Sequence, residues 1–201
     1  MIAIVDYDAG NILSVENALK RLGAAFEVTS DPLELRKADH VILPGVGEAS
    51  SAMSRLDALQ PCGESLSDAI RSLTVPVLGI CIGMQLLCAS SEEGNAGCLG
   101  LFKPKVRCFP KDTGDKVPHI GWNTADNLEG PLFKGIPDGS FFYYVHSFYP
   151  ETAEGETIAV TQHAGCTFSA ALWKDNFFGT QFHPEKSGMA GSKLLENFLS
   201  L

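Results

Sequence analysis

The segment of this sequence best suited to chemistry is an apolar stretch, Val75–Ile80, that runs through Cys81 into Ile82-Gly83. A cysteine within Gly-Ile-Cys-Ile-Gly, between a strand and a helix, is typical of a strained turn that exposes a nucleophile. Glycines two residues on either side remove side chains that would collide with each other or with a substrate. A helix N-terminus favours the thiolate form. The pattern predicts a thiol nucleophile, and a merely buried cysteine in a tight turn is the alternative.

A second segment, Phe178–Lys186, could supply the groups that such a thiol needs. A thiol nucleophile requires a base, and the base requires an orienting acceptor. His183 can take or give the thiol proton, and Glu185 follows on the same side of an extended chain, with Pro184 fixing the backbone between them. Alone, His-x-Glu is equally typical of a surface histidine beside a solvated carboxylate. A metal site would need a third ligand, and none is evident nearby.

Alternating strands and helices must position these two segments. Apolar runs predict strands over Ile2–Asp6, Phe26–Thr29, Val41–Leu43 and Val75–Ile80. Helical spacing predicts helices from Leu13 to Leu22, over Pro32–Lys37, over Leu66–Leu73 and from Met84 to Cys88. This alternation favours an α/β fold in which a parallel sheet carries helices on both faces.

The second half of the chain is rich in strands. Aromatic and β-branched runs predict strands over Val106–Phe109, Phe141–Phe148, Thr157–Thr161, Phe168–Trp173 and Phe177–Phe182. We expect them to extend the same sheet, in part antiparallel, and Lys193–Leu199 to form a closing amphipathic helix. No repeat or linker interrupts the sequence, so residues 1–201 are predicted to form one domain.

Composition excludes several classes of function. With 15 Lys and Arg against 24 Asp and Glu, the net charge is −9, which argues against nucleic acid as a partner. No apolar run approaches the roughly 20 residues that span a bilayer, and Met1–Asp6 carries no basic leader, so we expect a cytoplasmic protein without a membrane segment. The six cysteines form no Cys-x-x-Cys pair, which argues against zinc, and we expect reduced thiols.

The cysteine segment and His183-Pro184-Glu185 together resemble the class I, or triad, glutamine amidotransferases over nearly the whole chain. That resemblance implies a flavodoxin-like fold with an open, mixed, mostly parallel sheet. It also implies that glutamine is hydrolysed to glutamate and ammonia through a thioester on Cys81. His183 would be the base and Glu185 its orienting group, and neither a metal nor an organic cofactor would be needed.

Four further segments narrow the resemblance. Val5–Asn11, Leu43–Gly47, Pro118–Asn123 and Tyr144–Tyr149 are similar to segments of the glutaminase subunits of imidazole glycerol phosphate synthase. The resemblance implies a heterodimer in histidine biosynthesis, in which ammonia passes to a (β/α)8-barrel cyclase subunit. It further implies a glutaminase that is poor alone and switched on by that partner, because glycines near Val46 would let a peptide rotate into or out of an oxyanion hole.

Roles for individual residues follow from the same resemblance. Oxyanion-hole donors would come from Gly45, Val46, Gly47 and Ile82, and glutamine would be held by Gln85, Ser147 and Phe148. The cyclase would be faced by Asn11, Trp122, Tyr143 and Lys186. Plainer interpretations stay open: an ordinary turn at the glycines, core packing of the two aromatic residues, and a helix cap at Asn11.

Two departures from the family pattern concern loops. Asp8-Ala9-Gly10-Asn11 replaces Gly-Met-Gly-Asn, and Glu48-Ala49-Ser50 stands where an aromatic residue is usual.

Three other classes of function remain open: a triad glutaminase such as the one serving pyridoxal phosphate synthase, a cysteine hydrolase of similar fold that acts on peptides or γ-glutamyl conjugates, and a non-catalytic flavodoxin-like binding domain. If His183 were not the base, His146 and His119 would be the next candidates, although a satisfied core histidine is the commoner role.

Overall fold

The structure, a computed structural model of the chain, describes residues 1–8, 12–111 and 114–201. A seven-stranded sheet forms its centre, in the spatial order β11 (Thr157–His163), β12 (Cys166–Lys174), β13 (Phe177–Thr180), β4 (Val77–Ile80), β3 (His40–Leu43), β1 (Ile2–Val5) and β2 (Phe26–Thr29). The run from β13 to β2 is parallel, whereas β12 pairs antiparallel with both β11 and β13. The predicted mixed, mostly parallel sheet is confirmed.

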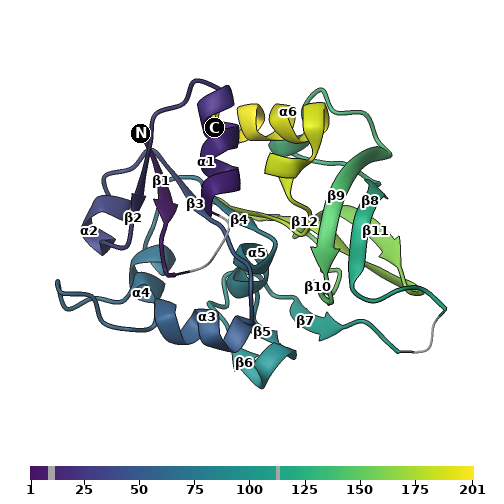
Figure 1. The fold of residues 1–201 in the computed structure, drawn as a ribbon, viewed down its shortest axis with the longest axis horizontal. Helices are drawn as coiled ribbons and strands as arrows, with labels where there is room; N and C mark the ends of the chain where they lie inside the picture. The colour runs from purple at the N-terminus through teal and green to yellow at the C-terminus, as the bar shows by residue number, and fades with distance from the viewer. Residues whose placement is uncertain (9–11, 112–113) are drawn as a thin grey trace.

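Helices cover both faces of this sheet (Figure 1). One face carries α1 (Ile12–Arg21) and α6 (Gly188–Phe198), and the other carries α3 (Ala49–Leu56), α4 (Leu66–Arg71) and α5 (Ile82–Leu87). The short α2 (Pro32–Leu35) follows β2 and is capped by the Asp31 carboxylate, which accepts from the Leu33 N–H. In the described ranges, no helix is long and apolar enough to cross a membrane.

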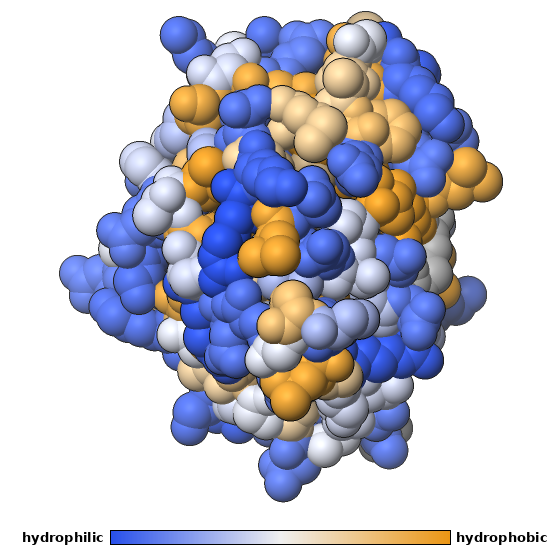
Figure 2. Space-filling model, turned by 90° about the vertical axis from the view of Figure 1, so that its left-hand side faces the viewer, coloured by the Kyte–Doolittle hydropathy of each residue, from blue (hydrophilic) through white to orange (hydrophobic). Residues whose placement is uncertain are grey.

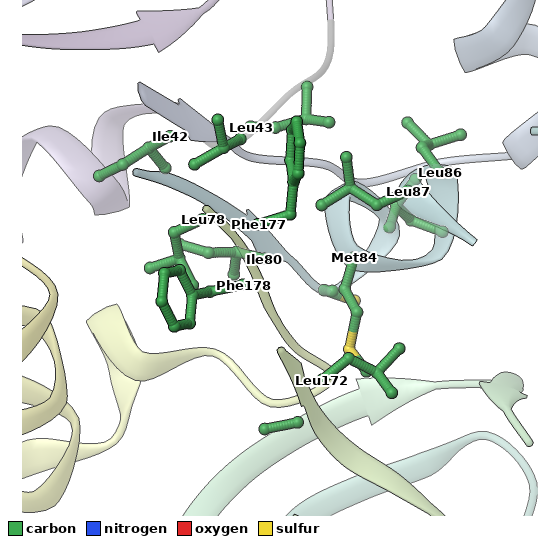
Figure 3. Packing of buried hydrophobic residues seen from close by; sticks show 14 of the residues in the cluster. Ile42, Leu43, Leu78, Ile80, Met84, Leu86, Leu87, Leu172, Phe177 and Phe178 are labelled. Atoms are coloured by element: carbon green, nitrogen blue, oxygen red, sulfur yellow. The ribbon is translucent and has the colours of Figure 1, made fainter. Parts of the chain in front are cut away.

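The core lies between the central strands and the helices. All four residues of β4 are buried, as expected for a parallel strand covered on both faces. Figure 3 shows Leu78 of β4 beside Phe178 of β13, whereas a Cβ added to the next residue of β4, Gly79, would lie 2.7 Å from the backbone nitrogen of Met84 in α5. Helix α5 therefore packs directly against the strand that it follows, which fixes the turn between them.

Two of the predicted strands lie outside the central sheet. A four-stranded sheet has the order β10 (Phe148–Pro150), β7 (Lys105–Cys108), β5 (Ser90–Ser91) and β6 (Ala96–Gly97). A separate antiparallel ribbon pairs β8 (His119–Ala125) with β9 (Ser140–His146). The expectation that Val106–Phe109 and Phe141–Phe148 extend the central sheet is wrong, because residue alternation predicts a strand without specifying its partner.

Other differences concern elements with few apolar residues. Helix α3 was not predicted, since its sequence is rich in serine and alanine, and α6 begins at Gly188, well before Lys193. Three 3₁₀ turns within the described ranges were also not predicted: η1 (Glu93–Asn95), η2 (Pro131–Phe133) and η3 (Pro184–Lys186). All six cysteines are free thiols.

Candidate active site

Cys81 is the single residue between the end of β4 and the start of α5. Cys81 follows the last residue of β4, precedes the first residue of α5, and has φ 55° and ψ −109°. A positive φ is strained for a residue with a side chain. The strain is held in place because the Cys81 N–H donates to the carbonyl of Thr180 on β13, at 2.7 Å.

The two flanking glycines are required by close packing. A Cβ added to Gly79 would lie 2.7 Å from the backbone carbonyl of Gly83, and a Cβ added to Gly83 would collide with the carbonyl of Leu43 on β3. The sequence suggested that glycines prevent collisions within the turn or with substrate. The structure shows a second reason: Gly83 packs directly against the Leu43 carbonyl at the end of the neighbouring strand β3.

His183 and Glu185 form a buried pair at the end of β13. The His183 Nδ1–H donates to Glu185 Oε1 at 2.8 Å, and the two side chains are 2% and 1% exposed. The His183 backbone is fixed as well, since its N–H donates to the Tyr143 carbonyl and its carbonyl accepts from the Ser187 hydroxyl. Among the described residues, His183 Nε2 has no hydrogen-bond partner.

Electrostatics favour a charged imidazole in this place. Burial alone would lower the pKa of His183, but the negative charge of a Cys81 thiolate, a side-chain interaction with Cys81 and the contact with Glu185 outweigh it and raise that pKa to about 10. Near neutral pH the imidazole of His183 is therefore charged beside the Cys81 sulfur, and a positive charge in that place is what activates a cysteine nucleophile.

A pocket of about 320 Å³ opens over the cysteine. The residues that line it are Val46, Gly47, Cys81, Ile82, Gln85, Glu93, Pro118, Val145, His146, Ser147, Phe148 and His183. Most of the residues predicted for catalysis and substrate binding thus meet at one cavity. Glu185 lies behind His183, and Gly45 is not part of the lining.

Gly45 belongs to the support of the loop that enters the pocket. A Cβ at Gly45 would lie 2.6 Å from the Tyr7 hydroxyl and 2.8 Å from the Ile82 Cβ. The Tyr7 hydroxyl donates to the Pro44 carbonyl at 2.7 Å, and burial raises the pKa of Tyr7, which keeps it a donor. Beyond this anchor Gly47 has φ 102°, a conformation that favours glycine.

Gln85 forms a further part of the pocket wall. Its Nε2 donates at 2.9 Å to the Phe148 carbonyl and at 2.9 Å to Gln181 Oε1, while its Oε1 is buried without a partner among the described residues. Glu93 adds a carboxylate whose Oε2 accepts from the Ala49 N–H at 2.9 Å, and burial raises the pKa of Glu93. The pocket is therefore lined by an amide, a carboxylate and the Cys81 thiol.

Polar residues that contact this site and were given no role from the sequence include Tyr7, Glu93 and Gln181. Tyr7 stands inside Val5–Asn11, a segment quoted for the family resemblance, and Gln181 stands inside Phe178–Lys186, two residues before His183. That spacing in an extended chain was a usable signal, since alternate residues share a face. Nothing in the sequence around Glu93 indicates that it reaches the pocket.

The two other candidate bases are occupied. His146 Nδ1 donates to the Phe148 carbonyl at 2.8 Å, and its Nε2 lies 2.9 Å from His119 Nδ1. Because Nδ1 of His146 must donate to a carbonyl, its Nε2 accepts a hydrogen bond from the Nδ1–H of His119. Burial lowers the pKa of His146 to about 3 and that of His119 to about 4, so both rings are neutral.

The residues predicted to face a partner lie on the outer side of the same region. The rings of Trp122 and Tyr143 meet edge to face at 6.1 Å on the β8–β9 ribbon, and Lys186 is exposed on η3. Trp122 is 56% exposed, so the core interpretation of this residue is wrong. Asn11 lies outside the described residues.

The outer face of the ribbon is apolar. Cross-strand pairing places Ile120 beside Val145 and Trp122 beside Tyr143, and Ile120 and Phe141 are 61% and 59% exposed. We call this set, Ile120, Trp122, Phe141, Tyr143 and Val145, the ribbon face. The opposite end of the molecule, seen in Figure 2, is a mosaic of hydrophilic residues and smaller hydrophobic groups. An apolar face of this kind is typical of a protein-binding surface.

Within the described parts of the chain, no group of three or more His, Cys, Asp or Glu side chains is arranged to hold a metal ion. The chemistry that the site can perform with its own groups is nucleophilic attack by a thiolate, followed by proton transfer through an imidazole that a carboxylate orients.

Comparisons with known proteins agree with this geometry. The family model described as "Glutamine amidotransferase class-I" matches residues 3–201. A protein of Bacteroides fragilis named "Imidazole glycerol phosphate synthase subunit HisH" is 51% identical over 201 residues, which cover 100% of this chain and 99% of that protein. A protein of the same name from Dehalococcoides mccartyi is 44% identical over 206 residues, covering 100% and 97%.

Solved structures show the same fold at low identity. A putative GMP synthase protein from Thermoplasma acidophilum superposes with a TM-score of 0.75 at 21% identity, covering 99% of this chain and 92% of that one. PurLQS from Thermotoga maritima gives a TM-score of 0.70 at 19% identity, covering 99% and 97%. Since the family model spans almost the whole sequence and full-length relatives share about half of its residues, the chain belongs to the class-I glutamine amidotransferase family.

Proposed function

We propose that this chain, residues 1–201 acting as one domain, is the glutaminase subunit of an imidazole glycerol phosphate synthase. One observation carries the proposal: Cys81 at the strained turn faces a buried His183–Glu185 pair across a pocket large enough for an amino acid. The identity to relatives that bear that subunit's name supports the particular enzyme. We place it in the cytoplasm, which six free thiols support.

In the first half of the reaction, the Cys81 thiolate attacks the side-chain carboxamide carbon of glutamine. A C–S bond forms, and the amide oxygen becomes an oxyanion. His183 then gives its Nε2 proton to the amide nitrogen, the C–N bond breaks, and ammonia leaves a γ-glutamyl thioester on Cys81. The unpartnered Nε2 of His183 is the nitrogen that this transfer requires.

In the second half, His183 is neutral and takes a proton from water. The hydroxide attacks the thioester, the C–S bond breaks, and glutamate leaves the Cys81 thiolate beside a protonated His183. Glu185 takes no proton in either half. Its 2.8 Å contact with Nδ1 fixes the ring so that Nε2 always faces the sulfur.

The remaining pocket groups bind and polarise the substrate. The N–H of Ile82, first in α5, and N–H groups of the loop at Val46 and Gly47 are the proposed oxyanion donors, with Gly45 as the close-packed base of that loop. The amino-acid end of glutamine lies against Gln85, Ser147 and Phe148, which line the pocket. The unpartnered Gln85 Oε1 and the Glu93 carboxylate suit its ammonium group.

The partner in this proposal is a (β/α)8-barrel cyclase subunit that docks on the ribbon face and forms a heterodimer with this chain. Trp122, Tyr143 and Lys186 are the predicted contacts, together with Asn11. Support comes from the apolar character of this face and from its link to the site, because the Tyr143 carbonyl accepts from the His183 N–H. Ammonia released at Cys81 passes to the cyclase.

The partner also switches the glutaminase on. Gly47 allows its loop to adopt more than one backbone conformation, so two orientations of the neighbouring peptide can differ by only a few kcal/mol. A docked subunit can therefore bias an N–H towards the oxyanion, and each 1.4 kcal/mol of such bias changes the rate about tenfold.

The test is glutamate release by the purified chain alone, and again with the cyclase subunit and its nucleotide-like ligand. The proposal expects slow release that rises at least about tenfold on addition. Serum albumin in place of the cyclase is the control for non-specific stabilisation. Full activity in isolation, unchanged by the cyclase, would contradict the gating and indicate a stand-alone hydrolase.

A further inference from the structure

Gln181 is a buried amide in direct contact with the sulfur of Cys81. It lies between the end of β13 and His183, its side chain is fully buried, and its Nε2 donates to Cys81 Sγ at 3.7 Å. We infer that Gln181 is a catalytic residue that stabilises the Cys81 thiolate by donating this N–H. The inference rests on the proposed function, which supplies the reaction that the thiolate serves.

A chain of contacts that starts at a fixed backbone carbonyl determines which end of the Gln181 amide faces the sulfur. The Phe148 carbonyl can only accept, so the Gln85 atom 2.9 Å away must be its NH₂ group. That same Nε2 lies 2.9 Å from the Gln181 amide, whose partner atom must then be the carbonyl oxygen, Oε1. The NH₂ group of Gln181 is left on the other side, towards Cys81.

The direction of this dipole decides its effect on the cysteine. A neutral thiol is a weak acceptor, whereas a thiolate is a strong one, because a hydrogen bond to a charged acceptor is roughly twice as strong as a neutral one. The Gln181 N–H therefore stabilises the charged form more than the neutral form. The charged imidazole of His183, two residues further along the same segment, acts on the sulfur in the same sense.

Full burial increases this contribution. No water competes for the Gln181 amide, and its oxygen is already satisfied by Gln85, so the donor needs no reorganisation during the reaction. Ordinary core packing would not require an amide at this position, since an apolar side chain of the same size would fill the space without needing hydrogen bonds.

The test measures Cys81 ionisation and turnover separately in Gln181→Met, which keeps the length of the side chain and removes the donor. We expect alkylation of Cys81 by iodoacetamide, followed by peptide-resolved mass spectrometry, to be about tenfold slower than wild type near neutral pH. The rates should converge at high pH, where every thiol is ionised. With the cyclase subunit present, kcat should fall by about tenfold or more while KM stays within about threefold.

The matched control is Thr180→Val, one residue away. Thr180 is fully buried and its hydroxyl donates to the Phe182 carbonyl at 3.0 Å, so the variant loses a buried hydrogen bond that does not touch the sulfur. It should leave the alkylation profile unchanged. If Gln181→Met does not fold, Gln181→Asn retracts the donor by one methylene and should slow alkylation in the same direction.

The inference is overturned if alkylation and kcat of the Gln181 variant match wild type, or if Thr180→Val reproduces the loss. It is separable from the proposed function. Wild-type enzyme that releases no glutamate with the cyclase refutes the function, while the alkylation profiles still decide whether Gln181 supports the thiolate.

Discussion

The N–H of His183 donates a hydrogen bond of 2.9 Å to the carbonyl of Tyr143 on β9. The proposed base is thus held by a strand whose outer side belongs to the ribbon face. Ser187 strengthens the same connection, because its hydroxyl accepts from the Tyr143 N–H and donates to the His183 carbonyl. Strand β9 is therefore hydrogen-bonded to the His183 backbone both directly and through the Ser187 hydroxyl.

A charge on the ribbon face should block activation by the cyclase. Ile120→Asp places a carboxylate on this apolar surface, and its burial on docking would be unfavourable. We expect the activation of glutamate release to fall by about tenfold or more, with the thermal midpoint of the isolated chain nearly unchanged because Ile120 is exposed. Leu33→Asp on α2, 51% exposed at the other end of the molecule, is the control and should be activated normally. Equal activation of both variants would rule out this docking surface.

The imidazole of His183 should stay protonated well above neutral pH. Its pKa is raised from 6.5 to about 10, so its protonation stabilises the fold fully below pH 6.5, and this contribution is lost as pH rises through about 10. Nitrogen NMR of labelled histidine should show a charged His183 ring between these limits. In Cys81→Ala the negative neighbour is gone, and the ring should titrate at lower pH. A wild-type ring that titrates near 6.5 would contradict the charged imidazole beside the Cys81 sulfur.

The sequence predicted the strands of the parallel half of the fold and most of the residues that line the pocket. Runs such as Ile2–Val5 are buried on both faces, and this leaves an unbroken apolar pattern that periodicity detects. Gly79 and Gly83 around Cys81 are an equally clear signal in the sequence, because close packing tolerates no Cβ at either position. These features are local, so a single segment reveals them.

The rest depends on contacts between distant segments. Strand β8 has a mixed burial pattern because one side packs on histidines and the other is exposed, and its partner β9 follows only after a long connection. Gln181 owes its orientation to Gln85, far away in the sequence. Glu93 reaches the pocket through its bond to Ala49. No local pattern encodes which segments pair, so these contacts became visible only in the folded chain.

Alanine at Gly83 should damage the fold itself. The new Cβ would meet the carbonyl of Leu43, and a backbone group of the central sheet cannot move aside cheaply. We expect a loss of about 1–3 kcal/mol in the free energy of unfolding, measured by urea denaturation. Gly97→Ala is the matched control, because its Cβ would meet nothing within 4 Å, and its change should stay within about 0.5 kcal/mol. Equal effects would mean that the turn is not pressed against β3.

The neutral His119–His146 pair should make the fold sensitive to acid. The folded-state pKa values, about 4 and about 3, lie below the ordinary 6.5. Between these pH values the two histidines therefore bind protons in the unfolded chain and not in the folded chain. Their contribution to stability is present above pH 6.5 and is lost as pH falls towards 4 and 3. Urea unfolding of His119→Asn across this range should give a shallower pH dependence than wild type. Parallel curves would show that His119 is protonated as easily in the folded state.

Covalent capture at Cys81 tests the central claim most directly. The enzyme, with the cyclase subunit present, is incubated with a thiol-reactive glutamine analogue and then mapped by peptide mass spectrometry. We expect the adduct on buried Cys81 and not on the exposed Cys62 and Cys108, protection by excess glutamine, and loss of glutamate release in proportion to labelling. Loss of activity with Cys81 unmodified, or glutamine hydrolysis by Cys81→Ala, would contradict the account.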